Sequence, residues 1–164
     1  MTTKIKTDLL VIGAGSGGLS VAAGAAQMGA DVTLLEGGKM GGDCLNYGCV
    51  PSKALIASGK AAHAQAHASP YGVTDVTPQV DYAKAKDHVH DVIAQIEPHD
   101  SQDRFESLGV RVIREYGQFI SDTEVQAGDH VIHARRIIIA TGSSPLVPPI
   151  PGLETVPYVT NETL

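Results

Sequence analysis

The chain has 164 residues, 43% of them hydrophobic and 18% charged, which is typical of a globular protein with one core. It carries 12 basic against 18 acidic residues, a formal net charge of −6. This balance disfavours nucleic acid as a partner, and no apolar run reaches the roughly 18 residues that a membrane span needs. The N-terminus lacks a signal-peptide pattern, so we expect a cytoplasmic protein.

The first 36 residues show a strand pattern, then a helix pattern, then a second strand pattern. The apolar run "DLLVI" at 8–12, bounded by glycine, predicts a short buried strand. "GAGSGG" follows, and the alanine-rich stretch after it predicts a helix that ends at Gly29. "ADVTLLE" predicts a second buried strand. Strand, turn, helix and strand in this order indicate a βαβ unit with two parallel strands.

The glycine turn is the first candidate binding site. Gly13, Gly15 and Gly18 match the G-x-G-x-x-G pattern directly after a predicted strand and at the start of a helix. The first glycine permits a tight turn, the second lets a pyrophosphate approach the backbone, and the third lets helix and strand pack closely. Glu36 ends the second strand, where its carboxylate can accept hydrogen bonds from ribose hydroxyls. The unit predicts a bound dinucleotide and leaves NAD and FAD open.

The middle of the chain is predicted to be helical. One helix should run from Pro51 to about His67, because proline is well placed in a first turn. A loop is expected at 69–80. "DYAKAKDHVHDVIAQI" predicts a second long helix, which is broken at Pro98 and resumes with Ser101 as its cap.

Beyond Gly109 the pattern becomes that of short strands. "VRVIREYGQFI", "TEVQA" and "HVIHA" predict a small antiparallel excursion, while "RRIIIAT" reads as a separate, buried central strand. The tail from 142 holds five prolines and predicts a connector. We therefore predict an α/β, Rossmann-like domain over 1–148, with a parallel sheet and a small antiparallel β-meander, and a connector over 149–164.

Both cysteines, Cys44 and Cys49, lie between the second strand and the next helix. A permanent disulfide is disfavoured in the cytosol, and structural zinc needs about four ligands, whereas the chain has no third cysteine. The N-terminus of a helix stabilises a thiolate, which favours a redox pair. Metal binding and inert core cysteines stay open as minor alternatives. His63 and His67 share a helix face without a further ligand in a recognised spacing, so we expect no metal site.

The string "GGDCLNYGCVPSK" resembles the redox-active segment of the class I pyridine nucleotide-disulfide oxidoreductases. This family includes dihydrolipoamide dehydrogenase, mercuric reductase and glutathione reductase. "GAGSGG", "EYGQF", "IIIATGSSP" and "PIPG" follow the family's order and spacing, so the resemblance covers essentially the whole chain. It implies that the dinucleotide at the glycine turn is FAD and that residues 1–148 are the N-terminal part of an FAD-binding domain.

The resemblance also implies roles for individual residues. Gly13, Gly15 and Gly18 would approach the FAD pyrophosphate, and Glu36 would bind the adenosine ribose. The other cofactor-binding positions it implies are Gly41 and Gly42 close to the cofactor, Gly117 at the adenine end, and Thr141, Gly142 and Ser143 after the last strand.

Three side chains would carry the chemistry that the resemblance implies. Cys49 matches the flavin-proximal cysteine, Cys44 the interchange cysteine that attacks the substrate, and Lys53 the lysine beside the reactive nitrogen of the flavin. The implied relay runs from NAD(P)H to FAD, then to the Cys44–Cys49 disulfide, and then to a small disulfide, a dithiol or a metal ion. A lipoamide dehydrogenase would run it in reverse.

The chain departs from the family pattern in two ways. Asp43 stands where the family usually has threonine, and a carboxylate there would repel phosphate unless it turned away. The family's nicotinamide-binding domain and the interface domain that completes the site across a homodimer would lie beyond 164, so we expect the N-terminal part of a longer enzyme. "CVPSK" and "TGSSP" favour the lipoamide dehydrogenase and mercuric reductase branches. The alternative is a non-catalytic flavin-binding or redox-sensing module.

Overall fold

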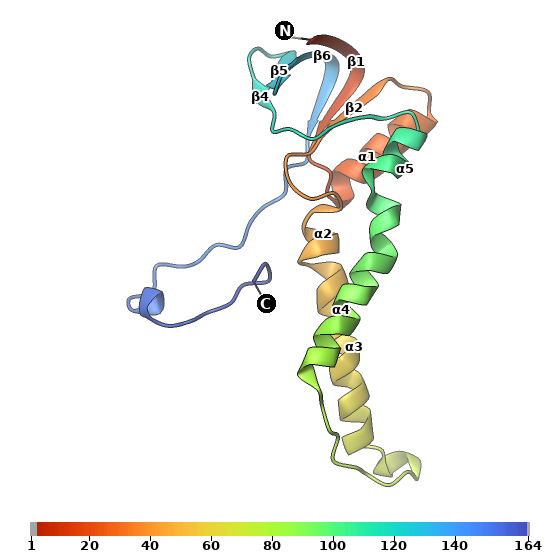
Figure 1. The fold of residues 1–164 in the computed structure, drawn as a ribbon, viewed down its shortest axis with the longest axis vertical. Helices are drawn as coiled ribbons and strands as arrows, with labels where there is room; N and C mark the ends of the chain where they lie inside the picture. The colour runs from red at the N-terminus through yellow and green to blue at the C-terminus, as the bar shows by residue number, and fades with distance from the viewer. Residues whose placement is uncertain (1–2, 164) are drawn as a thin grey trace.

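The computed structural model describes residues 3–163. Its centre is one six-stranded sheet with the strand order β3-β2-β1-β6-β5-β4. Figure 1 shows this sheet at one end of the molecule and a long pair of helices that extends away from it. The fold is the predicted α/β, Rossmann-like arrangement.

The predicted βαβ unit is confirmed. It consists of β1 (Thr3–Ile12), α1 (Ser16–Gln27) and β2 (Val32–Leu35), and the two strands are parallel. β1 begins five residues earlier than the apolar run suggested, because its first half pairs with the distant strand β6. An apolar pattern identifies the buried half of a strand. It does not identify the other half, which is a strand because its backbone pairs with β6.

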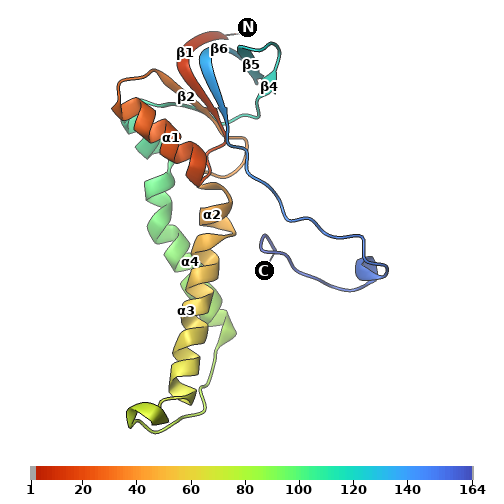
Figure 2. The ribbon, with the colours of Figure 1, turned by 180° about the vertical axis from the view of Figure 1, so that it is seen from behind.

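Four helices follow before the chain returns to the sheet. They are α2 (Gly42–Asn46), α3 (Cys49–Ala66), α4 (Tyr82–Ile96) and α5 (Gln102–Ser107), with short 3₁₀ turns at Ser69–Tyr71 and Glu97–Asp100. The predicted break at Pro98 is confirmed, and Ser101 caps α5 by accepting a hydrogen bond from the Arg104 N–H at 3.3 Å. Figures 1 and 2 show α3 and α4 side by side, and we call this pair the helical arm.

The strand predictions after Gly109 need a correction. β3 (Arg111–Ile113) pairs in parallel with β2 and therefore belongs to the parallel sheet. Only β4 (Gln118–Phe119), β5 (Glu124–Ala127) and β6 (His130–Ile139) form the antiparallel meander. The local pattern of a three-residue strand carries no information on its direction, which is decided by the partner strand.

β6 corrects two further expectations. "HVIHA" and "RRIIIAT" form one continuous strand, because its whole length pairs with β1. The strand is central in the sheet, as expected, but its apolar end is not buried: Ile138 is 37% and Ile139 66% exposed. No helix of the described residues covers this end of the strand.

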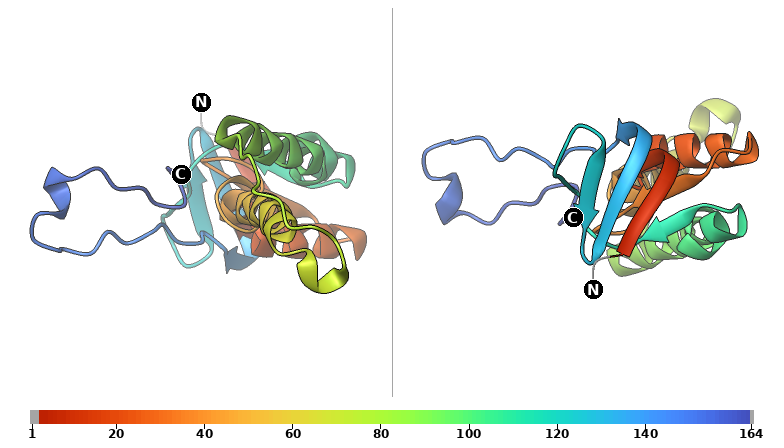
Figure 3. Two further views of the ribbon diagram at one scale, coloured as in Figure 1. Left: turned by 90° about the horizontal axis from the view of Figure 1, so that it is seen from below. Right: turned by 90° about the horizontal axis from the view of Figure 1, so that it is seen from above.

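Two apolar clusters lie on opposite faces of the sheet. One packs α1 and α5 onto the strands and includes Leu34 and Phe105, while the other lies beneath the meander and includes Leu10 and Ile132. Figure 3 shows the helices on one side of the sheet and the connector leaving on the other. The predicted glycine turn follows β1 at the carboxyl edge of the parallel strands.

The connector after β6 contains only a 3₁₀ turn at Leu153–Thr155 as regular structure. It runs out from the sheet and returns, so that its last described residues lie near α2 (Figures 1 and 2). Within residues 3–163, none of the helices has the length and apolar character required to cross a membrane.

Candidate functional site: a glycine turn beside a pair of cysteines

The glycine turn lies at the carboxyl edge of the parallel sheet. The Gly13 N–H donates to the Leu35 carbonyl at 2.8 Å, and the Ala140 N–H donates to the Ile12 carbonyl at 2.8 Å. Gly13 has a φ of +106°, and a Cβ on it would lie 2.2 Å from the Ala140 carbonyl oxygen. Only glycine fits here, because three strand ends converge on this residue.

The other two glycines of the pattern have different tasks. A Cβ on buried Gly18 would lie 1.8 Å from the Gly13 carbonyl oxygen, so this glycine lets α1 pack closely on the turn. Gly15 has open space around its missing side chain, with only the Gly42 Cα at 3.9 Å. No side chain among the described residues caps the N-terminus of α1. Its free N–H groups and this open backbone fit the phosphates of a dinucleotide.

A second glycine pair ties the cysteine segment to this turn. Gly15 and Gly41 form a parallel β-bridge, and the Gly41 N–H donates to the Ala14 carbonyl at 2.9 Å. Gly42 has a φ of +56°, and a Cβ on it would lie 2.6 Å from the Gly15 Cα. The segment that carries both cysteines is thus held directly against the predicted phosphate site.

Glu36 reaches over the same turn. Its carboxylate accepts hydrogen bonds from the Ala14 N–H at 2.7 Å and from the Gly38 N–H at 2.6 Å. Each carboxylate oxygen keeps capacity for a further donor. The group is therefore oriented at the strand end, as ribose binding would require.

A small cavity of about 80 Å³ brings four predicted residues together: it is lined by Gly13, Glu36, Gly117 and Thr141, among others. Sequence reasoning missed Tyr116, which also lines it and whose ring lies over Gly37, where a Cβ would come within 2.6 Å of ring atoms. The available signal was an aromatic residue directly before Gly117, the predicted adenine-site glycine.

Three predicted residues are placed less closely or have another role. Gly142 has a φ of +70° with open space around it, and Ser143 is exposed, so both lie outside the lining of this cavity. Gly117 also has a packing role, since a Cβ on it would lie 2.9 Å from side-chain atoms of Leu35 and Val125.

The cysteines lie on two consecutive helices. Cys44 is half-buried within α2, and Cys49 is exposed as the first residue of α3; both are free thiols. A hydrogen bond with the Cys49 side chain raises the pKa of the Cys44 thiol, partial burial adds to this rise, and the nearby positive charge of Lys53 opposes it. The structure thus brings Cys44, Cys49 and Lys53 together.

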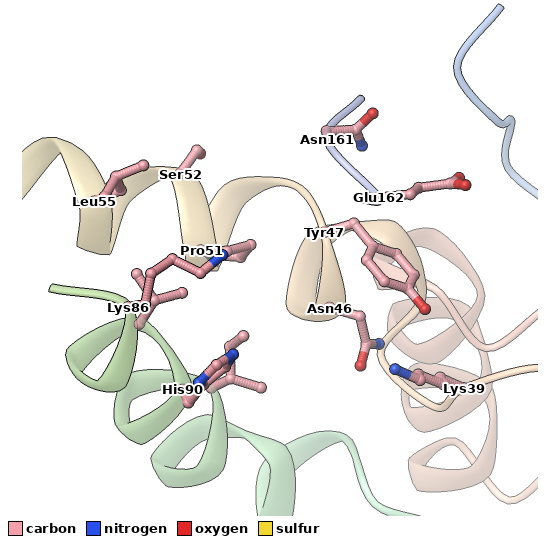
Figure 4. A pocket seen from close by; sticks show the side chains of 12 residues that line it. Lys39, Asn46, Tyr47, Pro51, Ser52, Leu55, Lys86, His90, Asn161 and Glu162 are labelled. Carbon is pink, nitrogen blue, oxygen red and sulfur yellow. The ribbon is translucent and has the colours of Figure 1, made fainter. Parts of the chain in front are cut away.

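A larger cavity of about 380 Å³ lies behind the cysteine segment, between the start of α3 and α4. Figure 4 shows Lys86 and His90 of α4 on one side of it, with Asn46, Tyr47 and Lys39 on the other. The Lys39 ammonium lies 5.1 Å from the centre of the Tyr47 ring, a cation–π contact. No local pattern in the sequence indicated that α4 would face Tyr47.

The comparisons with known proteins agree with this geometry. The family model described as pyridine nucleotide-disulphide oxidoreductase matches residues 7–163. The chain is 36% identical to mercuric reductase of Staphylococcus aureus over 155 residues, which are 94% of this chain and 28% of that protein. It is 37% identical to dihydrolipoyl dehydrogenase 2, chloroplastic, of Arabidopsis thaliana over 144 residues, which are 86% of this chain and 25% of that protein.

A solved structure shows the same fold. The copper(II) complex of the HOCl-induced flavoprotein disulfide reductase RclA from Escherichia coli matches with a TM-score of 0.73 and 26% identity, over 92% of this chain and 31% of that one. The chain thus spans about a third or less of the length of these relatives. From the match of the family model over almost its whole length, the chain belongs to the pyridine nucleotide-disulphide oxidoreductase family.

Proposed function

We propose that this chain is the FAD-binding and redox-active part of a flavoprotein disulfide reductase. The observation that supports the proposal is the contact between the two segments: the β-bridge from Gly15 to Gly41 joins the segment of Cys44 and Cys49 to the glycine turn. FAD, when bound, supplies two-electron transfer between a nicotinamide cofactor and the cysteine pair.

The residues that would hold FAD come from the carboxyl edge of the sheet and from segments that follow its strands. The free N–H groups at the start of α1 would bind the pyrophosphate, and the Glu36 carboxylate would accept hydrogen bonds from the adenosine ribose. Gly117 and Thr141 would line the adenine end, with Gly142 and Ser143 beyond them. Lys53, on the helix that Cys49 begins, would face the flavin.

The chemistry of the cysteines is thiol–disulfide exchange. The Cys44 thiolate attacks one sulfur of a small disulfide, forms a mixed disulfide and releases the first thiol. The Cys49 thiolate then attacks the Cys44 sulfur, releases the second thiol and closes the Cys44–Cys49 disulfide. Two electrons pass from the dithiol to the substrate. The positive charge of Lys53 favours the Cys44 thiolate, while the hydrogen bond with Cys49 and partial burial outweigh it and leave the pKa of the Cys44 thiol raised.

The substrate, the redox partner and the assembly are part of the proposal. We propose a small disulfide, a dithiol or a thiophilic metal ion as substrate, since two neighbouring thiolates can also bind a soft metal ion. Among these three classes, the name mercuric reductase supports the metal ion, and the name dihydrolipoyl dehydrogenase supports the dithiol. We further propose NAD(P)H as the electron donor, a homodimer for the full-length protein and a cytoplasmic location.

The proposal is tested by oxidation of the chain with oxidised dithiothreitol. The reagent takes two electrons and two protons from the cysteines, and its S–S bond breaks as theirs forms. Intact mass should fall by two hydrogen atoms in the wild type, and in neither C44S nor C49S. A wild-type chain that stays a dithiol across all redox buffers would refute the redox assignment.

Cofactor binding needs its own measurement. We expect the wild-type chain to quench FAD fluorescence, and C44S and C49S to do the same, because neither thiol forms the dinucleotide turn. A chain that binds no FAD while its circular dichroism is that of a folded protein would contradict the cofactor assignment without affecting the test of the cysteines.

A further inference from the structure

Asp43 is the residue at which the sequence departs from the family pattern, and its contacts differ from those of a phosphate-binding residue. It lies in the first turn of α2, between Gly42, which packs against Gly15, and Cys44. Its side chain is exposed to solvent, but both carboxylate oxygens have close neighbours. The environment of each oxygen indicates what the residue does.

The first neighbour is the turn between the two cysteines. Asp43 Oδ2 lies so close over Gly48 that a Cβ on this glycine would be 2.5 Å from it. The Asp43 backbone carbonyl also accepts the N–H groups of Tyr47 at 2.8 Å and of Gly48 at 2.6 Å. Asp43 therefore contacts Gly48, the residue directly before Cys49, through both its carboxylate and its backbone carbonyl.

The second neighbour comes from the other end of the chain. Asn161 Nδ2 donates a hydrogen bond to Asp43 Oδ1 at 3.0 Å, across 118 residues of sequence. Asn161 itself stands in a turn in which the Thr160 N–H donates to Thr163 Oγ1 at 2.8 Å. The returning connector thus fixes the orientation of the Asp43 carboxylate.

We propose that Asp43 is a positioning residue for the Cys44–Cys49 pair, whose carboxylate is held over Gly48 by the Asn161 amide and disfavours the dithiol form. The physical reason is charge. Asp43 is adjacent to Cys44 in the sequence, and its carboxylate lies over Gly48, which precedes Cys49. At a pH high enough for the thiols of the reduced pair to ionise, this negative charge opposes their thiolates, whereas it leaves the uncharged disulfide unaffected. The inference rests on the redox function proposed above.

The test uses the chain of 164 residues in dithiothreitol redox buffers, with thiols trapped by alkylation after an acid quench. At a pH above the thiol pKa values, we expect D43N to shift the equilibrium toward the dithiol about three- to tenfold, which is about 14 to 30 mV for a two-electron couple. At neutral pH, where the raised pKa keeps the Cys44 thiol protonated, the shift should be smaller. D122N makes the same charge change in the distant turn between β4 and β5 and serves as the matched control. An unchanged equilibrium in D43N, or a shift toward the disulfide, overturns the proposal.

The role of Asn161 is tested by a double-mutant cycle. N161A frees the carboxylate and should shift the equilibrium in the same direction as D43N but by less. Because Asn161 acts only through Asp43, the double variant should match D43N alone. Shifts that simply add would remove Asn161 from the proposal.

Two further measurements keep the test independent of folding and of the redox assignment. Where D43N does not fold, D43T carries the residue that is usual in the family and should give the same shift. The rate at which iodoacetamide alkylates Cys44 at a fixed pH should rise in D43N whether or not the pair forms a disulfide. If the wild type forms no disulfide, the proposed function fails, while the alkylation rate still decides the effect of Asp43.

FAD affinity distinguishes an Asp43 carboxylate that faces Gly48 from one that faces the FAD pyrophosphate. With the carboxylate turned to Gly48, D43N should change the FAD dissociation constant by less than about twofold. A carboxylate that faced the pyrophosphate would repel it, so a D43N variant that binds FAD about tenfold more tightly would overturn the proposal.

Discussion

The sheet together with α1 and α5, which we call the sheet unit, and the helical arm differ in how much apolar surface they bury. Most of the fully buried apolar side chains lie in the strands, in α1 and in α5, whereas α3 and α4 bury only Ala54 and Val89 among the described residues. The arm also exposes large side chains, among them Ile56 and Tyr82 at 56% and 55%. The glycine turn thus lies on the well-packed unit, and Cys49 begins the loosely packed arm.

This difference predicts two levels of stability in one chain. Regions with few buried contacts open locally at lower free energy than the core. We therefore expect the backbone amides of α3 and α4 to exchange hydrogen faster than those of β1, β2 and β6. The Cys44–Cys49 pair then lies at the junction between the well-packed sheet unit and a more easily opened helix pair.

The largest expected effect comes from a core substitution in each unit. L34A removes a fully buried side chain of β2 and should lower the free energy of unfolding by about 4 kcal/mol. V89A removes two methyl groups from the arm and should cost about 1.5 kcal/mol. Urea denaturation measures both, with hydrogen exchange to locate the effect. If V89A speeds hydrogen exchange in β1, β2 and β6 as much as in α3 and α4, the arm and the sheet unfold as one unit.

The next effect concerns the glycine turn. G18A places a Cβ against the Gly13 carbonyl oxygen and should destabilise the chain by about 3 kcal/mol, with loss of FAD binding. G17A is the matched control in the same turn, because nothing lies within 4 Å of its added Cβ. It should leave stability the same or slightly higher, because alanine favours a helix. A G18A variant as stable as G17A would contradict the packing described here.

A smaller effect is expected for ribose recognition. E36Q keeps the shape of Glu36 but removes its charge and one of its acceptor oxygens. We expect FAD to bind about tenfold more weakly, since hydrogen bonds to a charged group contribute about 1.5 kcal/mol or more. E154Q, on the exposed 3₁₀ turn of the connector, is the control. An FAD affinity in E36Q equal to that of E154Q would remove Glu36 from the binding site.

The smallest effects compare the caps of two helices. S101A removes the cap of α5 in the sheet unit, and D81A removes that of α4 in the arm, where Asp81 Oδ1 accepts the Lys84 N–H at 3.2 Å. Each should cost about 1 kcal/mol. S101A should lower the global stability in denaturant, and D81A should mainly speed the exchange of arm amides. A purely global effect of D81A would argue against a separately opening arm.

The local pattern determined much of this protein. The glycine turn, the helix break at Pro98 and the Ser101 cap were all readable, because each depends on residues a few positions apart. The string from Gly41 to Lys53 predicted a redox pair, and the structure brings Cys44 and Lys53 together. The roles of these residues toward FAD stay predictions for the experiments above.

Only the tertiary structure decided the features that join distant segments. The parallel direction of β3, the single long strand β6 and the exposure of Ile139 depend on which strands pair and on what covers them. The contact from Asn161 to Asp43 and the facing of α4 toward Tyr47 are likewise non-local. A sequence pattern reports how a residue relates to its neighbours along the chain, whereas pairing and burial depend on residues far along it.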